Sequence, residues 1–329
     1  MPKSVLSAVE PDKLLDLKFM CSVCREGELT KRADATLSCP HCDSHYTCRG
    51  DQPDLRPEFA WHPDTAVEKT KPEVELDDTE RWQNAIKLFL RRSPKLYRFL
   101  VYTIGTAYYG GTSSQRFVDS LGSDALVLSV GAGVLRLNGK RVVHLDYEPY
   151  AALEVVGDAH ALPFADNTFD GVVCETLLEH VLEPERVIAE MERILKPGGQ
   201  IYILMPFLFA FHAAPNDFSR LTHRGLAHRM KAFDIKSLRP FSGPASALNN
   251  ILVDFFALVC SLGSRRLYRL FSIAFLPVFA PIKYLDILLN HHPEACRIAS
   301  IFLCIAEKKE VEKKEVEKKE TILQQEGIS

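Results

Sequence analysis

The sequence has little net charge and no long uninterrupted apolar run. Its 329 residues include 40 Lys and Arg against 43 Asp and Glu, which gives a net charge of −3. This balance gives no electrostatic reason to expect nucleic acid as an obligatory partner. The longest apolar run, Leu270–Ile282, has thirteen residues and is too short to span a bilayer.

Signal-peptide and low-complexity features are also missing. The first twenty residues interrupt every apolar stretch with a charge, so no hydrophobic region of a signal peptide can be drawn. Gly (17) and Pro (19) are too few for a collagen-like or wholly disordered chain, and 47% of the residues are hydrophobic. We therefore expect a globular, cytoplasmic protein.

Cysteine, by contrast, is well represented. Four of the nine cysteines form two C-x-x-C pairs, Cys21 with Cys24 and Cys39 with Cys42. Two such pairs can fill the four corners of a tetrahedral zinc site and leave no position open for water. We therefore expect a structural zinc ion and not a catalytic one. Nearby residues that the symmetric pairs do not need as ligands are His41, His45 and Cys48.

Changes in composition divide the chain into five segments. We expect a cysteine-bearing domain at 1–57, an acidic linker at 58–79, two helices at 80–120, a main domain at 121–309 and a charged tail at 310–329. The first segment resembles small zinc-ribbon domains with a Pro-Asp-Leu-Arg-Pro signature, which here is Pro53–Pro57. The tail repeats Glu and Lys with no apolar face, which predicts a solvated helix or disorder.

The main domain begins with short apolar runs: ALVLSV, RVVHLD, ALEVVGD, DGVVC and QIYILM. Runs of this kind suit strands buried on both faces. Helical spacing between the last two runs predicts a strand, helix, strand unit with parallel pairing. The sequence therefore predicts an α/β fold.

Backbone and carboxylate groups that suit a nucleoside ligand follow these strands. Gly131 and Gly133 end the first strand, Asp146 ends the second, and Asp158 with Ala159 follows the third. Ligands of open α/β sheets bind at this carboxyl edge. A dinucleotide fingerprint would need a third glycine where Arg136 stands, so a nicotinamide enzyme is disfavoured.

The series VLSVGAG, HLDYEP, GDAHALPFADNTFD, CETLLEHV and RILKPGG closely resembles class I S-adenosylmethionine-dependent methyltransferases of the ubiquinone and menaquinone branch, over about residues 125–205. The resemblance implies a Rossmann-like seven-stranded sheet of order 3-2-1-4-5-7-6, whose last two strands are supplied by residues 233–241 and 298–309. It implies these cofactor contacts: Gly131 and Gly133 at the methionine part, Asp146 at the ribose, Asp158 and Ala159 at the adenine, and Glu175 at the methionine end. Ser129 and Leu135 depart from the family pattern, where an acid and a glycine are usual.

Two histidines are candidate catalytic residues. His180 lies in the family motif Leu178–Val181, and His212 opens a segment that resembles the H-x-x-P-x-D-x-x-R-x-T signature of the same branch. Either could take a proton from an acceptor that must be deprotonated. His180 has the alternative role of hydrogen-bonding loops near the cofactor, and Asp217 with Arg220 forms either a structural ion pair or a substrate contact.

An apolar insertion with scattered basic residues occupies 245–290. It predicts either a helical lid buried on the sheet or a basic amphipathic surface that docks on a membrane. We expect a small-molecule or lipid-like acceptor. Two other functions stay open. The fold could be a non-catalytic binding scaffold, or the ribbon could guide RNA methylation; the eight basic and nine acidic residues of 1–57 disfavour the latter.

Overall fold

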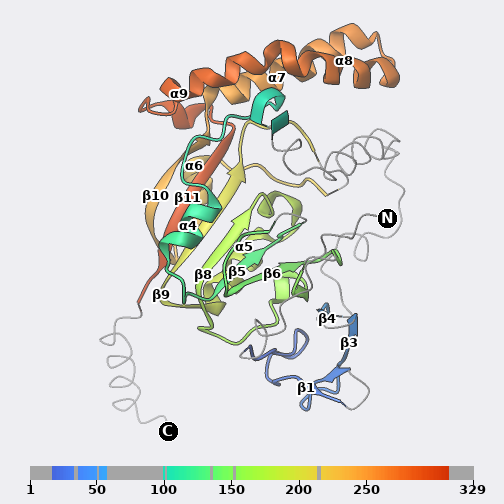
Figure 1. Cartoon of the computed structure of the whole chain (residues 1–329), viewed down its shortest axis with the longest axis vertical. Helices are drawn as coiled ribbons and strands as arrows, with labels where there is room; N and C mark the ends of the chain where they lie inside the picture. The colour runs from blue at the N-terminus through green and yellow to red at the C-terminus, as the bar shows by residue number, and fades with distance from the viewer. Residues whose placement is uncertain are drawn as a thin grey trace, which may run out of the picture.

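The computed structural model describes residues 17–32, 36–49, 52–57, 99–100, 102–133, 136–150, 153–212 and 216–310. Some expected segments lie outside these ranges: the linker at 58–79, residues 80–98 of the two helices expected at 80–120, and all but the first residue of the tail at 310–329. Within these ranges, a mixed β-sheet runs through the centre of the molecule (Figure 1).

Seven strands of this sheet have the order predicted from the sequence. They are β7 (Val155–Val156), β6 (Val142–Asp146), β5 (Val127–Val130), β8 (Phe169–Glu175), β9 (Leu195–Pro206), β11 (Ile301–Lys308) and β10 (Phe233–Ser242). The first five are parallel, whereas β11 is antiparallel to both β9 and β10. Numbered along the domain, this order is 3-2-1-4-5-7-6, which confirms the predicted methyltransferase fold.

The central strands form because they can bury both of their faces. All four residues of β5 and the first four of β6 are buried. Helix α5 (Pro184–Ile194) covers one side with Val187, Met191 and Ile194, each fully buried. The strand order reverses between β5 and β8, so the carboxyl ends of these strands open a crevice there. Two further helices are α4 (Ser114–Ser120) and α6 (His223–Arg229).

The cysteine-bearing segment joins the sheet and does not form a separate one. Its strands β1 (Thr30–Lys31), β2 (Leu37–Ser38), β3 (His45–Arg49) and β4 (Gln52–Asp54) continue the sheet beyond β7. Asp54 pairs with Val156, and the Leu55 N–H donates to the Val156 carbonyl at 2.8 Å. The Pro-Asp-Leu-Arg-Pro signature is therefore the contact with the main domain, where Leu55 is fully buried.

The insertion forms helices at the opposite end of the molecule from this segment (Figure 1). Helices α7 (Pro244–Ser261) and α8 (Arg265–Phe279) pack side by side, and α9 (Asp286–Leu289) follows them. The Asp286 carboxylate accepts from the N–H groups of Gly243, Ala245 and Ser246 at 2.8–3.0 Å, which anchors the first turn of α7.

Burial separates the two alternatives predicted for the insertion. Helix α7 buries Ala245, Ala247, Val253 and Ala257, but α8 has no buried residue. Helix α7 packs mainly against α8, α9 and the 3₁₀ turn Ala280–Leu285, so a lid buried on the sheet does not describe α8. Pro244–Ser261 and Arg265–Leu289 are long and apolar enough to cross a membrane by length and composition. The thirteen-residue apolar run lies within the second of these segments. Leu267, Tyr268 and Tyr284 lie outside the run and make the apolar segment longer than the run.

Candidate functional site

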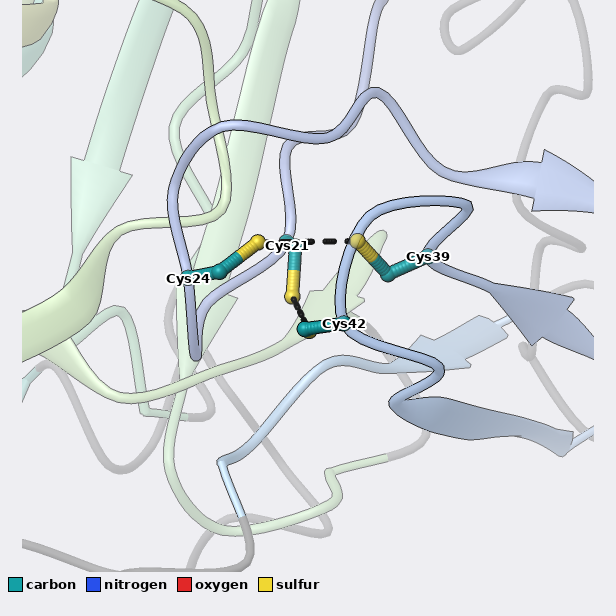
Figure 2. A group of neighbouring side chains, drawn as sticks. All are labelled: Cys21, Cys24, Cys39 and Cys42. Carbon is teal, nitrogen blue, oxygen red and sulfur yellow. Dashed lines mark hydrogen bonds between the residues drawn. The ribbon is translucent and has the colours of Figure 1, made fainter.

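The four paired cysteines converge at one point in the first segment (Figure 2). Cys21 Sγ lies 3.5 Å from Cys42 Sγ, and Cys24 Sγ lies 3.5 Å from Cys39 Sγ. All four sulfur atoms lie within 4.8 Å of one another, and none forms a disulfide. Zinc–sulfur bonds of about 2.3 Å place sulfurs at comparable separations. The donor set therefore fits a tetrahedral metal ion.

Hydroxyl and amide groups surround these sulfurs. The Tyr46 hydroxyl lies 3.1 Å from Cys21 Sγ, and the Ser44 hydroxyl lies 3.1 Å from Cys42 Sγ. Hydrogen bonds from the side chain and backbone of Ser44 lower the pKa of Cys42 to about 6. For Cys42 these groups favour the thiolate, which is the form that binds metal, whereas burial raises the pKa of Cys39 to about 11.

The glycine bend and the second-strand acid are joined by a hydrogen bond. Gly131 and Gly133 have φ values of +68° and +58°, which side chains rarely tolerate. A Cβ on Gly131 would come within 3.0–3.2 Å of Leu177. The Gly133 N–H donates to Asp146 Oδ2 at 2.8 Å, so the bend holds this carboxylate at the carboxyl edge of β6. Burial raises the pKa of Asp146 even though backbone N–H groups bond to it.

The third-strand acid begins a short 3₁₀ turn, Ala159–Ala161. Asp158 Oδ1 accepts from the His160 N–H at 2.9 Å and lies 2.7 Å from His160 Nδ1. Asp158 is 3% exposed, so its carboxylate is fixed beneath the turn. Ala159 follows it on the cavity wall.

A cavity of about 210 Å³ lies at the point where the strand order reverses. Five of the predicted site residues line it together: Gly131, Asp146, Asp158, Ala159 and His180. Three others do not line it. Gly133 donates to Asp146, which does line the cavity, and the His212 ring packs against the ring of His180. Glu175 lies near Ser114 and Tyr202. Tyr147, Leu177 and Asn216 also line the cavity, although the sequence had not singled them out.

His180 and His212 meet beside a buried carboxylate. Their ring centroids are 4.9 Å apart. Glu179 Oε1 lies 3.7 Å from His180 Nε2 and 3.9 Å from His212 Nε2. Burial raises the pKa of Glu179 to about 8, and burial with the neighbouring His180 lowers that of His212. Sequence reasoning assigned no role to Glu179, although its position next to His180 in the quoted motif was the available signal.

An ion pair fixes the loop that carries His212. Asp217 contacts Arg220, and Asp217 Oδ2 accepts from the His212 N–H at 2.8 Å. Arg220 also donates to the carbonyls of Phe209 and Ala210. Each of these contacts lies within the loop, which supports the structural alternative for this pair over substrate contact.

The cysteine-bearing segment contacts two walls of the cavity. Arg25 donates to the His160 carbonyl at 3.2 Å and pairs with Glu190 at 3.0 Å. Arg56 bonds to both oxygens of Asp54 and lies over the ring of Tyr147, 5.1 Å from its centroid. No sequence signal indicated these contacts, because they join residues that are far apart in the chain.

Of the two departures from the family pattern, Ser129 has a local explanation and Leu135 lies outside the described residues. Ser129 is a buried residue of β5, where an uncharged side chain needs no counter-charge. Arg136 pairs with Glu154, and that carboxylate also accepts from the His144 N–H. The described residues between β5 and β6, 131–133 and 136–141, contain no helix.

Comparisons with known proteins agree with this topology. A family model described as a methyltransferase domain matches residues 128–203. A demethylmenaquinone methyltransferase of Renibacterium salmoninarum is 34% identical over 134 residues, which cover 41% of this chain and 51% of that protein. A ubiquinone/menaquinone biosynthesis C-methyltransferase of a Ruegeria species is 32% identical over 41% of this chain and 50% of its own length.

A shorter match concerns a lipid enzyme. A phosphatidylethanolamine N-methyltransferase of Cereibacter sphaeroides is 41% identical over 68 residues, covering 21% of this chain and 33% of that protein. The chain spans about half the length of the quinone-related relatives that it matches. Residues 128–203 therefore match a methyltransferase domain in sequence and in topology, and they carry the parallel strands β5 to β9 whose carboxyl edge borders the cavity.

Proposed function

On the premise that residues 128–203 form a methyltransferase domain, we propose that the protein transfers a methyl group from S-adenosylmethionine to a small, apolar or lipid-like acceptor. The observation that carries the proposal is the hydrogen bond between Asp146 and the Gly133 N–H. It holds an acid at the edge of the sheet beside a bend without side chains, and Asp158 lies across the same cavity. Such a site suits an adenosyl group joined to a charged chain.

Each predicted residue has a role in this proposal. Asp146 accepts the ribose hydroxyls, Asp158 and Ala159 hold the adenine, and Gly131 with Gly133 lets the methionine part approach the backbone. Glu175, which does not line the cavity, is the weakest of the proposed contacts. When bound, the cofactor supplies an electrophilic methyl group on a sulfonium, so the protein mainly has to align the acceptor and exclude water. We further propose His180 and His212 as the residues that act on the ionisable group of the acceptor.

The acceptor class is proposed from the insertion and the relatives. Large apolar side chains are exposed over α7, α8 and α9, including Leu248, Ile251, Phe255, Leu258, Val259, Leu262, Leu270, Val278, Leu285, Ile287 and Leu288. Single exposed apolar residues are normal on a protein surface, but these residues form an extended apolar surface. Such a surface suits contact with a bilayer or a lipid. Asn250 of α7 accepts from the Ala210 N–H at 3.3 Å, which connects this surface with the loop of His212.

Charge on the insertion favours an anionic membrane surface. Arg265, Arg266 and Arg269 lie at the start of α8. The two acids of the insertion are Asp286, which is buried, and Asp254, which accepts from the Tyr268 hydroxyl at 3.0 Å. Basic residues beside an apolar face add attraction to anionic lipids. We propose that the protein is cytoplasmic and docks peripherally through 245–290.

We also propose that Cys21, Cys24, Cys39 and Cys42 bind one structural zinc ion. Four thiolates close the coordination shell, so this ion has no open position for a substrate. The strands around it are two to five residues long and bury few side chains, so metal binding would supply much of their folding free energy.

Calorimetric titration with S-adenosylmethionine and S-adenosylhomocysteine tests the proposed activity. We expect binding by the wild-type chain and at least about tenfold weaker binding by Asp146→Ala, because a charge-assisted hydrogen bond is worth about 1.5–3 kcal/mol. Asp234→Asn is a matched control, since that acid is exposed and pairs with Lys236 far from the cavity. Equal binding by Asp146→Ala and wild type, or none by either, would contradict the proposal and favour a non-catalytic scaffold.

A further inference from the structure

The buried carboxylate of Glu179 has no hydrogen-bond partner in the described part of the chain. The residue is fully buried, and neither carboxylate oxygen accepts a hydrogen bond from any described residue. A buried carboxylate without hydrogen bonds is costly, because the protein interior replaces none of its hydration. Such a group in a native protein calls for a proton or a cation beside it.

Both imidazoles have their Nε2 atom toward the Glu179 carboxylate. His180 Nδ1 bonds to the Asn216 carbonyl, so this nitrogen carries the proton and Nε2 is left with a lone pair. His212 Nδ1 lies 3.3 Å from the Ala210 carbonyl and 3.5 Å from Asp217 Oδ2. These two acceptors favour a proton on His212 Nδ1, whereas Arg220 Nη2, 3.2 Å from the same atom, can donate only to an unprotonated Nδ1. Binding of a cation through Nε2 requires the first tautomer, in which Nε2 keeps its lone pair beside the carboxylate.

Three electron-pair donors therefore point at one another. Glu179, His180 and His212 each offer one ligand atom, and these three atoms lie within 4.8 Å of one another. Metal–ligand bonds of about 2.0–2.2 Å require neighbouring donors to lie about 3–3.5 Å apart. The 3.7 Å and 3.9 Å separations of Glu179 from the two imidazoles need only a small contraction to reach this range.

The surroundings of the two histidines have the form found around metal ligands. A metal-binding imidazole usually donates its other N–H to a carbonyl or a carboxylate, which fixes the ring. Asn216 does this for His180, and Ala210 with Asp217 does it for His212. Arg220 in turn holds Asp217 and the Ala210 carbonyl.

We propose that Glu179, His180 and His212 bind one divalent transition-metal cation of the zinc or ferrous class. Two imidazoles and one carboxylate suit such ions better than Mg²⁺ or Ca²⁺, which prefer oxygen ligands. With three protein ligands the ion keeps open positions, in contrast to the four-thiolate cluster. His180 lines the cavity, so these positions border it. Resting on the proposed function, the inference has His180 and His212 act on the acceptor through the cation and not as free bases. It names an acceptor with an oxygen donor, such as a hydroxyl or enolate.

Metal stoichiometry of the full-length chain tests this inference. The protein is stripped with a chelator, titrated with Zn²⁺ and assayed for bound metal, and we expect two equivalents per wild-type chain. Glu179→Gln and His212→Ala are each expected to bind one equivalent, while the exposed control His228→Ala binds two. With Co²⁺, the thiolate charge-transfer bands are expected to stay in Glu179→Gln while the weaker bands of a nitrogen and oxygen site disappear.

The outcomes separate this inference from the proposed function. Thermal unfolding checks that each variant is folded, and cofactor titration is repeated on the same samples. One equivalent in the wild type, or two in both Glu179→Gln and His212→Ala, would overturn the cation site whatever the cofactor result. Two equivalents in the wild type and one in each variant, without cofactor binding, would support the site and contradict the methyltransferase activity.

Discussion

The guanidinium carbon of Arg56 lies 5.1 Å from the ring centroid of Tyr147. Arg56 belongs to the cysteine-bearing segment, whereas Tyr147 lines the cavity directly after Asp146. Arg56 also bonds to Asp54, the residue of β4 that pairs with β7. The cysteine-bearing segment and the proposed cofactor site therefore share a wall, and a change in one is expected to alter the other.

Loss of the proposed zinc ion is expected to weaken cofactor binding. Cys42→Ser removes one thiolate, which should release the ion and loosen the contacts that Arg25 and Arg56 make with the cavity walls. Zinc content and calorimetric titration with S-adenosylmethionine measure the two effects together. Cys260→Ser on α7 is the matched control and should change neither. Unchanged affinity in a zinc-free variant would show that the two sites are independent.

Leu55→Ala is expected to destabilise the contact between the cysteine-bearing segment and the sheet. Leu55 is fully buried beside Val156, and a leucine-to-alanine change at such a site costs about 2–5 kcal/mol. Denaturant unfolding measures the loss as a lower midpoint. Val23→Ala is the control, because the Val23 side chain is 44% exposed and should change the free energy of unfolding little. A Leu55→Ala midpoint equal to that of the control would contradict the proposed contact.

Acidic pH is expected to destabilise the protein partly through Glu154. This carboxylate is buried, but the His144 side chain and Arg136 more than offset the burial and lower its pKa below 4.5. A depressed pKa means that the unfolded state binds the proton more tightly, so the stabilisation is present above pH 4.5 and is lost as pH falls through the folded pKa.

Glu154→Gln should remove this contribution. We expect the variant to be less stable than wild type at neutral pH, with a smaller further loss as the pH falls below 4.5. Unfolding midpoints measured across this range test the expectation, and Asp119→Asn on the surface of α4 serves as control. Parallel stability curves for Glu154→Gln and wild type would refute a role for this group.

Membrane docking predicts an effect of charge on the exposed apolar surface. Leu262 is 89% exposed between α7 and α8, and Leu270 is 60% exposed on α8. Leu262→Asp and Leu270→Asp should each reduce flotation with vesicles of phosphatidylglycerol and phosphatidylcholine, and high salt should weaken flotation of the wild type. Val23→Asp places the same charge on the cysteine-bearing segment and should float as wild type. Absence of wild-type flotation would remove the membrane from the proposal.

Several site residues were predictable because their signals are local. Gly131 and Gly133 follow an apolar run, and a bend with positive φ at this position favours glycine whatever the rest of the fold does. Asp146 and Asp158 end strands whose order in the chain already places them on one edge of a parallel sheet. Glu175 shows the limit of this reasoning, since it also follows a strand but lies near Ser114, away from the cavity.

Glu179 and His212 illustrate what local patterns miss. The sequence places Glu179 beside His180, but only the fold buries its carboxylate and brings His212 from beyond β9 to within 3.9 Å of it. The insertion shows the same limit, because its composition left a lid and a membrane surface open. The choice between them depends on which residues of α7 and α8 become buried in the folded chain. Helix α7 has buried residues, whereas α8 has none.

The sequence by itself determined the α/β fold, the glycine bend and the four-cysteine cluster, and the strand order was implied by its resemblance to methyltransferases. Apolar periodicity, turn residues and ligand spacing are properties of neighbouring residues, and they specify such features directly. Tertiary structure alone decided that the Pro-Asp-Leu-Arg-Pro segment pairs with β7, that Arg56 lies over Tyr147 and that Glu179 faces two imidazoles. These contacts join residues separated by tens of positions, and their energies depend on burial and mutual geometry, which arise only when the whole sheet has formed.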